Sequence, residues 1–196
     1  MLTKERVMTE AHEAPKVAVA DRAIEEAEEV VRNHRTATDY LLGAARLSIG
    51  WIFFWGFIDK LFGLGFATAA DKAWIAGGSP TFGFLSFGAK GPFAEIFKGM
   101  AGMVVVDWMF MLGLLTIGVT LMLGIGVRLG AYIGVLMLLL MYTAGFILPE
   151  HNPIIDEHIV YAIIMLTLAA TGAGRYLGLG KVWAKTGLVK RFPILE

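Results

Sequence analysis

Polar and apolar residues are distributed unevenly along this chain. Residues 1–37 are polar and charged, whereas long apolar runs dominate the rest and approach or exceed the ~20 residues that a helix needs to cross a bilayer. Four of these runs cover about residues 40–66, 104–125, 129–148 and 153–172. The pattern predicts an all-α membrane protein. Residues 38–181 would form a four-transmembrane-helix bundle and residues 182–196 a basic tail.

The charged region 1–37 contains a weaker periodic pattern. Apolar side chains recur at alternating three- and four-residue spacing, which predicts an amphipathic helix with one narrow apolar seam. The seam consists of Val17, Ala20, Ile24, Ala27 and Val31. Such a helix either rests on the membrane surface or docks a partner, and two heptads are short for a coiled coil. The first 38 residues hold no apolar core of a secretory signal, so we expect the first span to insert uncleaved.

Glycine punctuates two further stretches. Residues 67–103 are rich in Gly and Phe and too broken to span, so we expect them to lie at the interface or to cap the bundle. Gly126, Gly130 and Gly134 form a GxxxGxxxG pattern, which lets helix backbones approach closely. We interpret that pattern as packing within the bundle rather than as a dimerisation face.

Composition supports a membrane protein and excludes several kinds of chemistry. Charged residues make up 17% of the chain, against about 25% in soluble domains. The net charge of +0 argues against a nucleic-acid partner. The chain has no cysteine, which excludes disulfides, thiolate catalysis and cysteine-ligated iron–sulfur clusters. The sequence also shows no ligand set for haem.

Lysine and arginine predict the orientation. Four spans place both termini on one side, where Arg128 joins the cations of the N-terminal region and of the tail. The second outer loop contains no Lys or Arg. The positive-inside rule therefore predicts a multi-pass cell-membrane protein with both termini in the cytoplasm.

This topology brings ionisable residues from separate helices to one outer layer. The layer would contain Asp59, Lys60, Asp107, Glu150, His151, Asp156, Glu157 and His158. Ionisable groups inside spans are costly and usually face the bundle interior or water, so they mark candidate sites. We take His158, Asp107, Asp59, Lys60 and Glu157 as candidate catalytic residues. Arg46 lies apart, near the cytoplasmic end of the first span.

Each of these residues also has a purely structural interpretation. Asn152 followed by Pro153 is typical of a helix start, with Asn as the N-cap and Pro at N1. Asp156 and Glu157 would then complement the helix dipole, as would Asp107 in its own helix. Asp59 and Lys60 could anchor the interface, and Arg46 could extend its guanidinium to the headgroups. These interpretations explain the acids well but explain His158 poorly.

Quinone chemistry is one use for such a layer. The carboxylate of Glu157, the imidazole of His158 and the phenol of Tyr161 can exchange protons with a ligand near neutral pH. The candidate cofactor-binding residues are Trp51, Trp55, Trp108, Tyr161 and Arg46, with Phe57 and Phe110 as further walls of an apolar slot. A metal bound by His151, His158 and nearby carboxylates is an alternative. Its ligands would have to come from separate helices.

Two stretches resemble a known family. "RLSIGWIFFWGFIDKLFG" (46–63) and "NPIIDEHIVYAIIMLTLAATGAGRYLGLG" (152–180) resemble the DoxX/DoxD family of small membrane proteins, and the likeness extends from about residue 38 to residue 185. The matching motif positions are Arg46, Gly56 and Lys60 in the first span and Gly172-Ala173-Gly174-Arg175 after the last.

The resemblance implies a four-helix membrane bundle. For DoxD-like members it implies a subunit of thiosulfate:quinone oxidoreductase, which couples oxidation of thiosulfate to tetrathionate with quinone reduction, together with a separate partner subunit. It supplies no catalytic residue, so the site residues rest on the topology. Two alternatives remain open: a non-catalytic accessory subunit of a larger respiratory complex, and a small-molecule or lipid transporter or chaperone.

Overall fold

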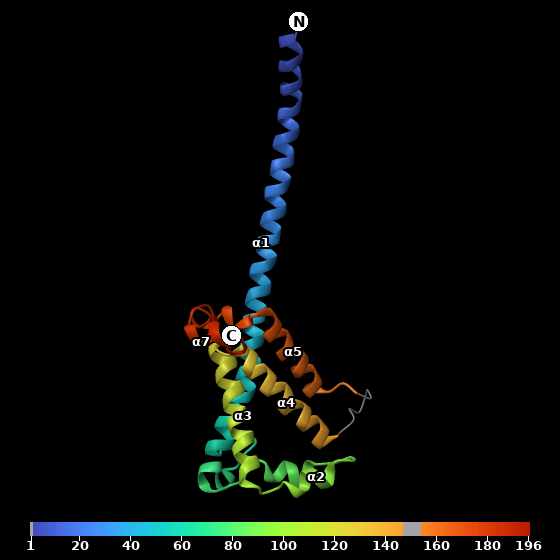
Figure 1. The fold of residues 1–196 in the computed structure, drawn as a ribbon. Helices are drawn as coiled ribbons and strands as arrows, with labels where there is room; N and C mark the ends of the chain where they lie inside the picture. The colour runs from blue at the N-terminus through green and yellow to red at the C-terminus, as the bar shows by residue number, and fades with distance from the viewer. Residues whose placement is uncertain (1, 147–153) are drawn as a thin grey trace. The chain divides into compact units, whose positions relative to one another are not determined.

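The protein is built from helices. A computed structural model describes the backbone of residues 2–146 and 154–196 and most of their side chains, apart from those of residues 2–21, 23, 24, 33 and 35. Every regular element within the described residues is helical (Figure 1). The prediction of an all-α protein is therefore confirmed for this part of the chain.

Twelve helical elements follow one another within the described residues. The α-helices are α1 (Leu2–Phe62), α2 (Ala94–Gly99), α3 (Val104–Leu123), α4 (Val127–Gly145), α5 (Glu157–Thr171), α6 (Gly180–Trp183) and α7 (Gly187–Arg191). The short 3-10 or π elements are η1 (Ala70–Lys72), η2 (Trp74–Ala76), η3 (Phe84–Gly88), η4 (Ala173–Arg175) and η5 (Pro193–Leu195).

The chain divides into two compact units, Met1–Tyr40 and Leu41–Glu196. The first consists of the beginning of α1, on which Val30 and Val31 are about half exposed. Helix α1 continues from Leu2 to Phe62, whereas the sequence suggested a separate helix before the first span. No glycine or proline lies between Pro15 and Gly43, so nothing in that stretch stops a helix.

Within the part of the chain that the structure describes, three helices are long and apolar enough to cross a membrane: Glu25–Phe62, Val104–Leu123 and Val127–Gly145. Helix α5 is equally apolar but has only 15 residues. Many large apolar side chains on these helices are exposed, including Leu41, Trp51, Val104, Trp108, Leu112, Leu136, Leu140 and Ile163. Soluble proteins rarely expose contiguous apolar surface on this scale, so these faces suit lipid.

Close glycine contacts hold the helices of the second unit together. A Cβ added at Gly118 of α3 would lie 2.7 Å from the Cα of Phe54 in α1, so these two helices meet backbone to backbone. Gly130 of α4 lies against Thr120 of α3, and Gly134 lies against Met165 of α5. The interpretation of the GxxxGxxxG pattern as internal packing is confirmed for Gly130 and Gly134.

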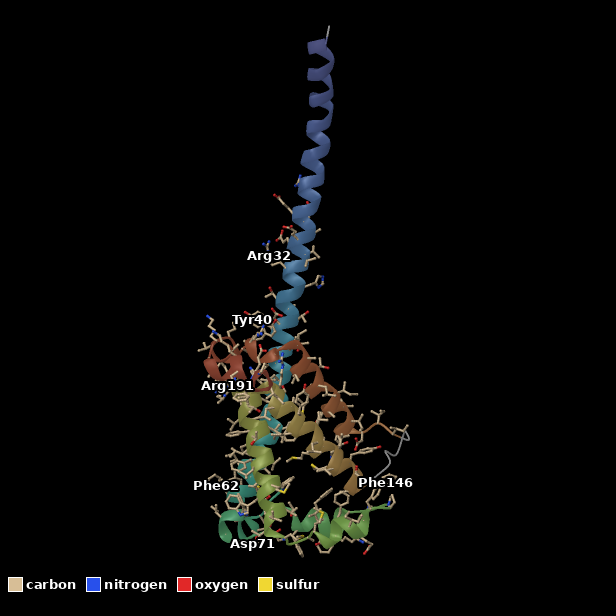
Figure 2. All side chains as sticks on the ribbon, viewed as in Figure 1. Arg32, Tyr40, Phe62, Asp71, Phe146 and Arg191 are labelled. Atoms are coloured by element: carbon tan, nitrogen blue, oxygen red, sulfur yellow. The ribbon has the colours of Figure 1, made fainter. Side chains whose placement is uncertain are left out.

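The connection between α1 and α3 (residues 63–103) folds back on the helix ends. It contains η1, η2, η3 and α2, none of which is long enough to cross a bilayer. The backbone N–H of Lys90 donates to the carbonyl of Ala144 at the end of α4, 2.9 Å away. Figure 2 shows Phe62, Asp71 and Phe146 at this end of the second unit and Arg191 at the other end. The two ends differ in ways that bear on function.

Candidate functional site

A cavity of about 360 Å³ lies where the end of α4 meets the start of α5. Its described lining residues are Phe84, Met141, Tyr142, Gly145, Phe146, Ile155, Asp156, Glu157 and His158. Apolar side chains from η3 and α4 form most of the wall, and the polar groups come from the chain entering α5. Ligand pockets usually measure ~300–1,000 Å³ and combine apolar walls with a few polar groups, and this cavity meets both criteria.

The polar groups are positioned by the cap of α5. Helix α5 begins at Glu157, and Asp156 is its N-cap. The Asp156 carboxylate accepts hydrogen bonds from the backbone N–H groups of His158 at 3.0 Å and Ile159 at 3.2 Å. The sequence suggested a start at Asn152 and Pro153, which lie outside the described residues. The helix begins later because Asp156 satisfies its first free N–H groups.

The same carboxylate also holds the His158 imidazole. The Nδ1 atom of His158 lies 2.8 Å from Oδ2 of Asp156, and both side chains are mostly buried. Burial alone would raise the pKa of Asp156, but the hydrogen bonds from the His158 ring and from the two backbone N–H groups outweigh it and lower that pKa below its ordinary value. A carboxylate bound to Nδ1 fixes the ring orientation and leaves Nε2 as the atom that can serve a ligand.

The opposite wall is tied down by aromatic residues that the sequence did not single out. The Tyr142 hydroxyl donates to the carbonyl of Ile154 at 2.8 Å, which joins α4 to the chain entering α5. Phe146 ends α4 in a left-handed conformation with φ of 35°, and its ring packs on Gly91. One sign of this wall was present in the sequence, the tyrosine within the run "LMLLLMYTAGF", because a hydroxyl in an apolar run needs a hydrogen-bond partner.

Asp59 and Asp107 do not join His158. Asp59 is 1% exposed and accepts hydrogen bonds from the backbone N–H groups of Phe66 at 3.2 Å and Ala67 at 2.9 Å. Asp107 accepts from the Thr81 hydroxyl at 2.6 Å, the Ser79 hydroxyl at 2.9 Å and the Thr81 backbone N–H at 3.2 Å.

Both carboxylates therefore fix the connection 63–103 to the helices. The expected single layer is only partly formed within the described residues. Glu157 and His158 meet at the cavity, whereas the acids of α1 and α3 bind the connection instead. The physical reason is that this connection supplies the backbone N–H and hydroxyl donors that bind each carboxylate.

Two further predicted residues are not among the described residues that line the cavity. Lys60 of α1 is half-buried, and Tyr161 of α5 packs against the apolar core. Glu150 and His151 lie outside the described residues, so the structure does not bear on a metal that includes His151. One ligand atom from each of Asp156, Glu157 and His158 lies within 4.8 Å of the others. The Asp156 oxygens already serve as the helix cap and as the partner of the imidazole.

The tryptophans do not form the expected slot. Trp51 is 50% exposed and stacks on Trp55 with ring centroids 5.5 Å apart. Trp108 is 52% exposed and contacts Trp74 edge to face at 4.7 Å. None of these four rings is among the described residues that line the cavity. Their exposed faces suit lipid instead, as tryptophans at a membrane boundary commonly do.

Arg46 serves the opposite end of the unit. It is 0% exposed, so the suggestion that its guanidinium extends to the headgroups is wrong. Nη1 donates to the carbonyls of Leu121 and Met122 at the end of α3, and Nη2 donates to those of Tyr176 at 3.0 Å and Leu177 at 2.9 Å. Free carbonyls at a helix C-terminus attract a cation, so Arg46 caps α3 and holds the turn after η4. These contacts make a cofactor-binding role for Arg46 unnecessary to explain its position.

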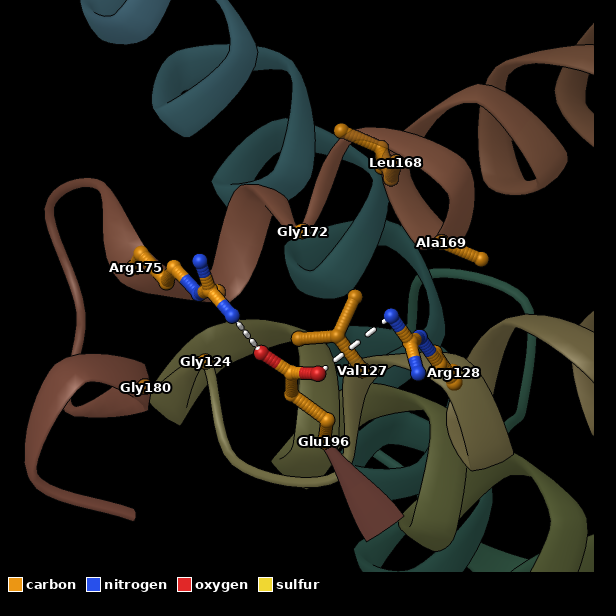
Figure 3. A pocket seen from close by; sticks show the side chains of 10 residues that line it. Gly124, Val127, Arg128, Leu168, Ala169, Gly172, Arg175, Gly180 and Glu196 are labelled. Carbon is orange, nitrogen blue, oxygen red and sulfur yellow. Dashed lines mark hydrogen bonds and ion pairs between the residues drawn. The ribbon is translucent and has the colours of Figure 1, made fainter. Parts of the chain in front are cut away.

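Close packing fills the space around this arginine. A Cβ added at Gly174 would lie 2.6 Å from the carbonyl oxygen of Gly124, so the two turns touch through their backbones. The adjacent void measures about 10 Å³, roughly the size that holds one water. Beside it the Glu196 carboxylate pairs with Arg128 at 3.3 Å and with Arg175 (Figure 3). Among the described residues, this void beside Arg46 is far smaller than a quinone ring.

Comparison with protein-family models, curated proteins and solved structures gives no match to this chain. The geometry of the cavity therefore carries the functional argument by itself.

Proposed function

We propose that this chain is a DoxX/DoxD-like membrane subunit of a quinone-linked oxidoreductase and that the cavity between η3, α4 and α5 holds the quinone ring. The observation that carries the proposal is the cavity itself. Mostly apolar walls line an open cavity of about 360 Å³ beside a largely buried imidazole whose Nδ1 atom is held by Asp156. A quinone needs a flat apolar space for its ring and a hydrogen-bond donor at its carbonyl oxygen, and these residues fit both needs.

The proposed bundle has four spans, with α5 as the fourth. The start of α5 shares the cavity with the end of α4, Met165 packs at Gly134 near the middle, and Leu168 borders the same small void as Val127 at the start of α4. Helix α5 thus runs antiparallel along almost all of α4. Its 15 residues extend about 22 Å, and local thinning of the bilayer accommodates so short a span.

The proposed orientation follows from charge. With four spans both termini lie in the cytoplasm of the cell, beside Arg128 and the cations after α5. The cavity then opens at the outer interface. A separate partner subunit at that face would oxidise the electron donor, thiosulfate in the family resemblance, and Lys60 would attract the anion.

The side chains at the cavity have distinct proposed roles. Bound quinone accepts two electrons and two protons and leaves as quinol. The Nε2 atom of His158 would hold a proton at the quinone oxygen, while Asp156 orients the ring through Nδ1. Glu157 would pass protons between water and His158, because it is exposed and lines the same cavity. Phe84 and Met141 would exclude water from the ring.

Quinone binding tests this proposal directly. We expect a short-chain benzoquinone to bind the purified full-length chain in mild detergent, and His158→Ala to weaken that binding about tenfold through loss of one hydrogen bond. His34→Ala is the matched control, because His34 is an exposed histidine of α1. Equal binding by wild type and both variants would remove His158 from the site, and no binding by wild type would overturn the proposal.

A second candidate function is a non-catalytic accessory subunit of a respiratory complex. It is favoured by the structural use of Asp59 and Asp107, which leaves fewer ionisable groups for chemistry. Purification in mild detergent separates the two candidates. Recovery only within a larger assembly, together with absent quinone binding, would favour the accessory role.

A further inference from the structure

The segment after η4, residues 176–196, is strongly cationic. Lys181, Lys185, Lys190 and Arg191 are all exposed. No acidic residue occurs between Glu157 and Glu196, and the Glu196 carboxylate is engaged by Arg128 and Arg175. The four exposed cations of this C-terminal segment (176–196) therefore have no acidic neighbour within the segment to neutralise them.

The same segment exposes apolar side chains between its cations. About half or more of each of six such side chains is exposed: Leu177, Leu179, Val182, Leu188, Phe192 and Ile194. Helices α6 and α7 have only four and five residues, so the segment cannot cross a bilayer. An alternation of exposed apolar and basic side chains is typical of a chain lying in the plane of the membrane interface.

Hydrogen bonds place this segment at the ends of membrane-crossing helices. The backbone N–H of Leu179 donates to the carbonyl of Leu123, the last residue of α3, at 2.9 Å. The backbone N–H of Arg128, at the start of α4, donates to the carbonyl oxygen of Glu196 at 3.0 Å. Both α3 and α4 are long and apolar enough to span, so the segment lies where the hydrocarbon ends and the headgroups begin.

We propose that the C-terminal segment binds the anionic headgroups of the leaflet in which it lies. Its apolar side chains would enter the acyl boundary, and the long stems of Lys181, Lys185 and Lys190 would carry their ammonium groups to lipid phosphates. Charge complementarity selects anionic over zwitterionic lipid. This inference depends only on the chain being in a membrane, and it stands whether or not the cavity binds quinone.

The other end of the unit supplies a natural comparison. Lys98 of α2 pairs with Glu95 at 3.3 Å, and Lys72 follows Asp71 directly. Two of the three described lysines of the connection 63–103, Lys72 and Lys98, thus have an acidic residue beside them in the chain or in an ion pair. Neutralising Lys72, Lys90 and Lys98 removes as many charges as neutralising Lys181, Lys185 and Lys190, without touching the C-terminal segment.

The test measures lipid retention by the purified full-length chain. Protein in mild detergent is mixed with equal amounts of phosphatidylglycerol and phosphatidylcholine, and retained lipids are counted by native mass spectrometry. Wild type should retain phosphatidylglycerol preferentially. The variant K181Q/K185Q/K190Q should bind it roughly a hundredfold more weakly, about fivefold for each cation. The variant K72Q/K90Q/K98Q should bind it as wild type does.

Several outcomes would overturn the proposal. These are equal retention of both lipids by wild type, an equal loss in the two triple variants, or displacement of phosphatidylglycerol by millimolar inorganic phosphate, which would indicate a soluble-anion site. Circular dichroism confirms that the variants remain helical. If K181Q/K185Q/K190Q fails to fold, the salt dependence of wild type decides, because headgroup attraction must weaken between low and high ionic strength.

Discussion

The two ends of the unit Leu41–Glu196 both bury ionisable side chains, but they use them differently. At one end the guanidinium of Arg46 is surrounded by four backbone carbonyls and by glycine contacts, beside a void of only about 10 Å³. At the other end the imidazole of His158 is held through Nδ1 and borders a cavity of about 360 Å³. Of these two buried groups, only His158 borders space for a ligand, so it is the stronger candidate for a functional site.

The partners explain this difference. Backbone carbonyls at a helix end are fixed acceptors that would otherwise lack donors, so Arg46 closes its end of the bundle. A short carboxylate at an N-cap leaves the second ring nitrogen of His158 available. We therefore expect substitutions at the Arg46 end to change stability most, and substitutions at the His158 end to change binding most.

The largest expected effect is that of Arg46→Ala. It leaves the carbonyls of Leu121, Met122, Tyr176 and Leu177 without their donors in an apolar setting, and we expect a loss of about 3 kcal/mol in the free energy of unfolding. Thermal unfolding in mild detergent measures it. Arg32→Ala, at an exposed position of α1, should stay within about 0.5 kcal/mol of wild type. Similar behaviour of the two variants would contradict a capping role for Arg46.

A smaller loss is expected from Gly174→Ala. The added Cβ would lie 2.6 Å from the Gly124 carbonyl oxygen and 2.9 Å from a methyl group of Val127, so the turns must separate. Overpacking of this kind costs about 2 kcal/mol. Gly187→Ala is the matched control, because nothing lies within 4 Å of its added Cβ. Unfolding of both alanine variants at the wild-type temperature would contradict the close packing of the turns at the Arg46 end.

The smallest expected effect is a pH-dependent change in the free energy of unfolding at the His158 end. The folded-state pKa of Asp156 lies below its ordinary value of 3.8, so its ionised form stabilises the fold above that value, and the stabilisation is lost as the pH falls through the lowered pKa. We expect Asp156→Asn to cost about 1 kcal/mol at pH 6, because the His158 ring loses its ionised hydrogen-bond acceptor, with the difference from wild type shrinking below pH 4.

Unfolding experiments between pH 3 and pH 7 measure this difference. Glu28→Gln, at an exposed position of α1, is the control for removal of a carboxylate far from this cap. A gap between wild type and Asp156→Asn that stays constant down to pH 3 would count against the lowered pKa.

Much of the fold could be predicted from local patterns. The expected spans near 104–125 and 129–148 correspond to α3 and α4 within a few residues, because apolar runs of that length form helices in lipid. The packing role of Gly130 and Gly134 followed from their spacing. Helix ends were less predictable. Asp156 starts α5 and Phe146 ends α4 through local contacts that the apolar spacing of the sequence does not reveal.

The site was only partly predictable. His158 and Glu157 were found because they interrupt an apolar run, and the structure brings them together at the cavity. Phe84, Met141 and Tyr142 were missed, since aromatic and apolar residues in a membrane protein carry no distinguishing signal. Asp59 and Asp107 were expected beside His158, but their hydrogen-bond donors come from the irregular connection, whose course cannot be read from local spacing.

The sequence by itself determined the helical character of this protein, the helices that are long and apolar enough to span a membrane, and which ionisable groups lie within apolar stretches. Each of these depends on residues close together in the chain. Only the tertiary structure decided what each group does. Arg46 became a helix cap, Asp59 and Asp107 became anchors of the connection, and His158 came to border a cavity. The physical reason is that the free energy of a buried charge depends on its nearest donors and acceptors, and for Arg46 and Asp107 these come from distant parts of the chain.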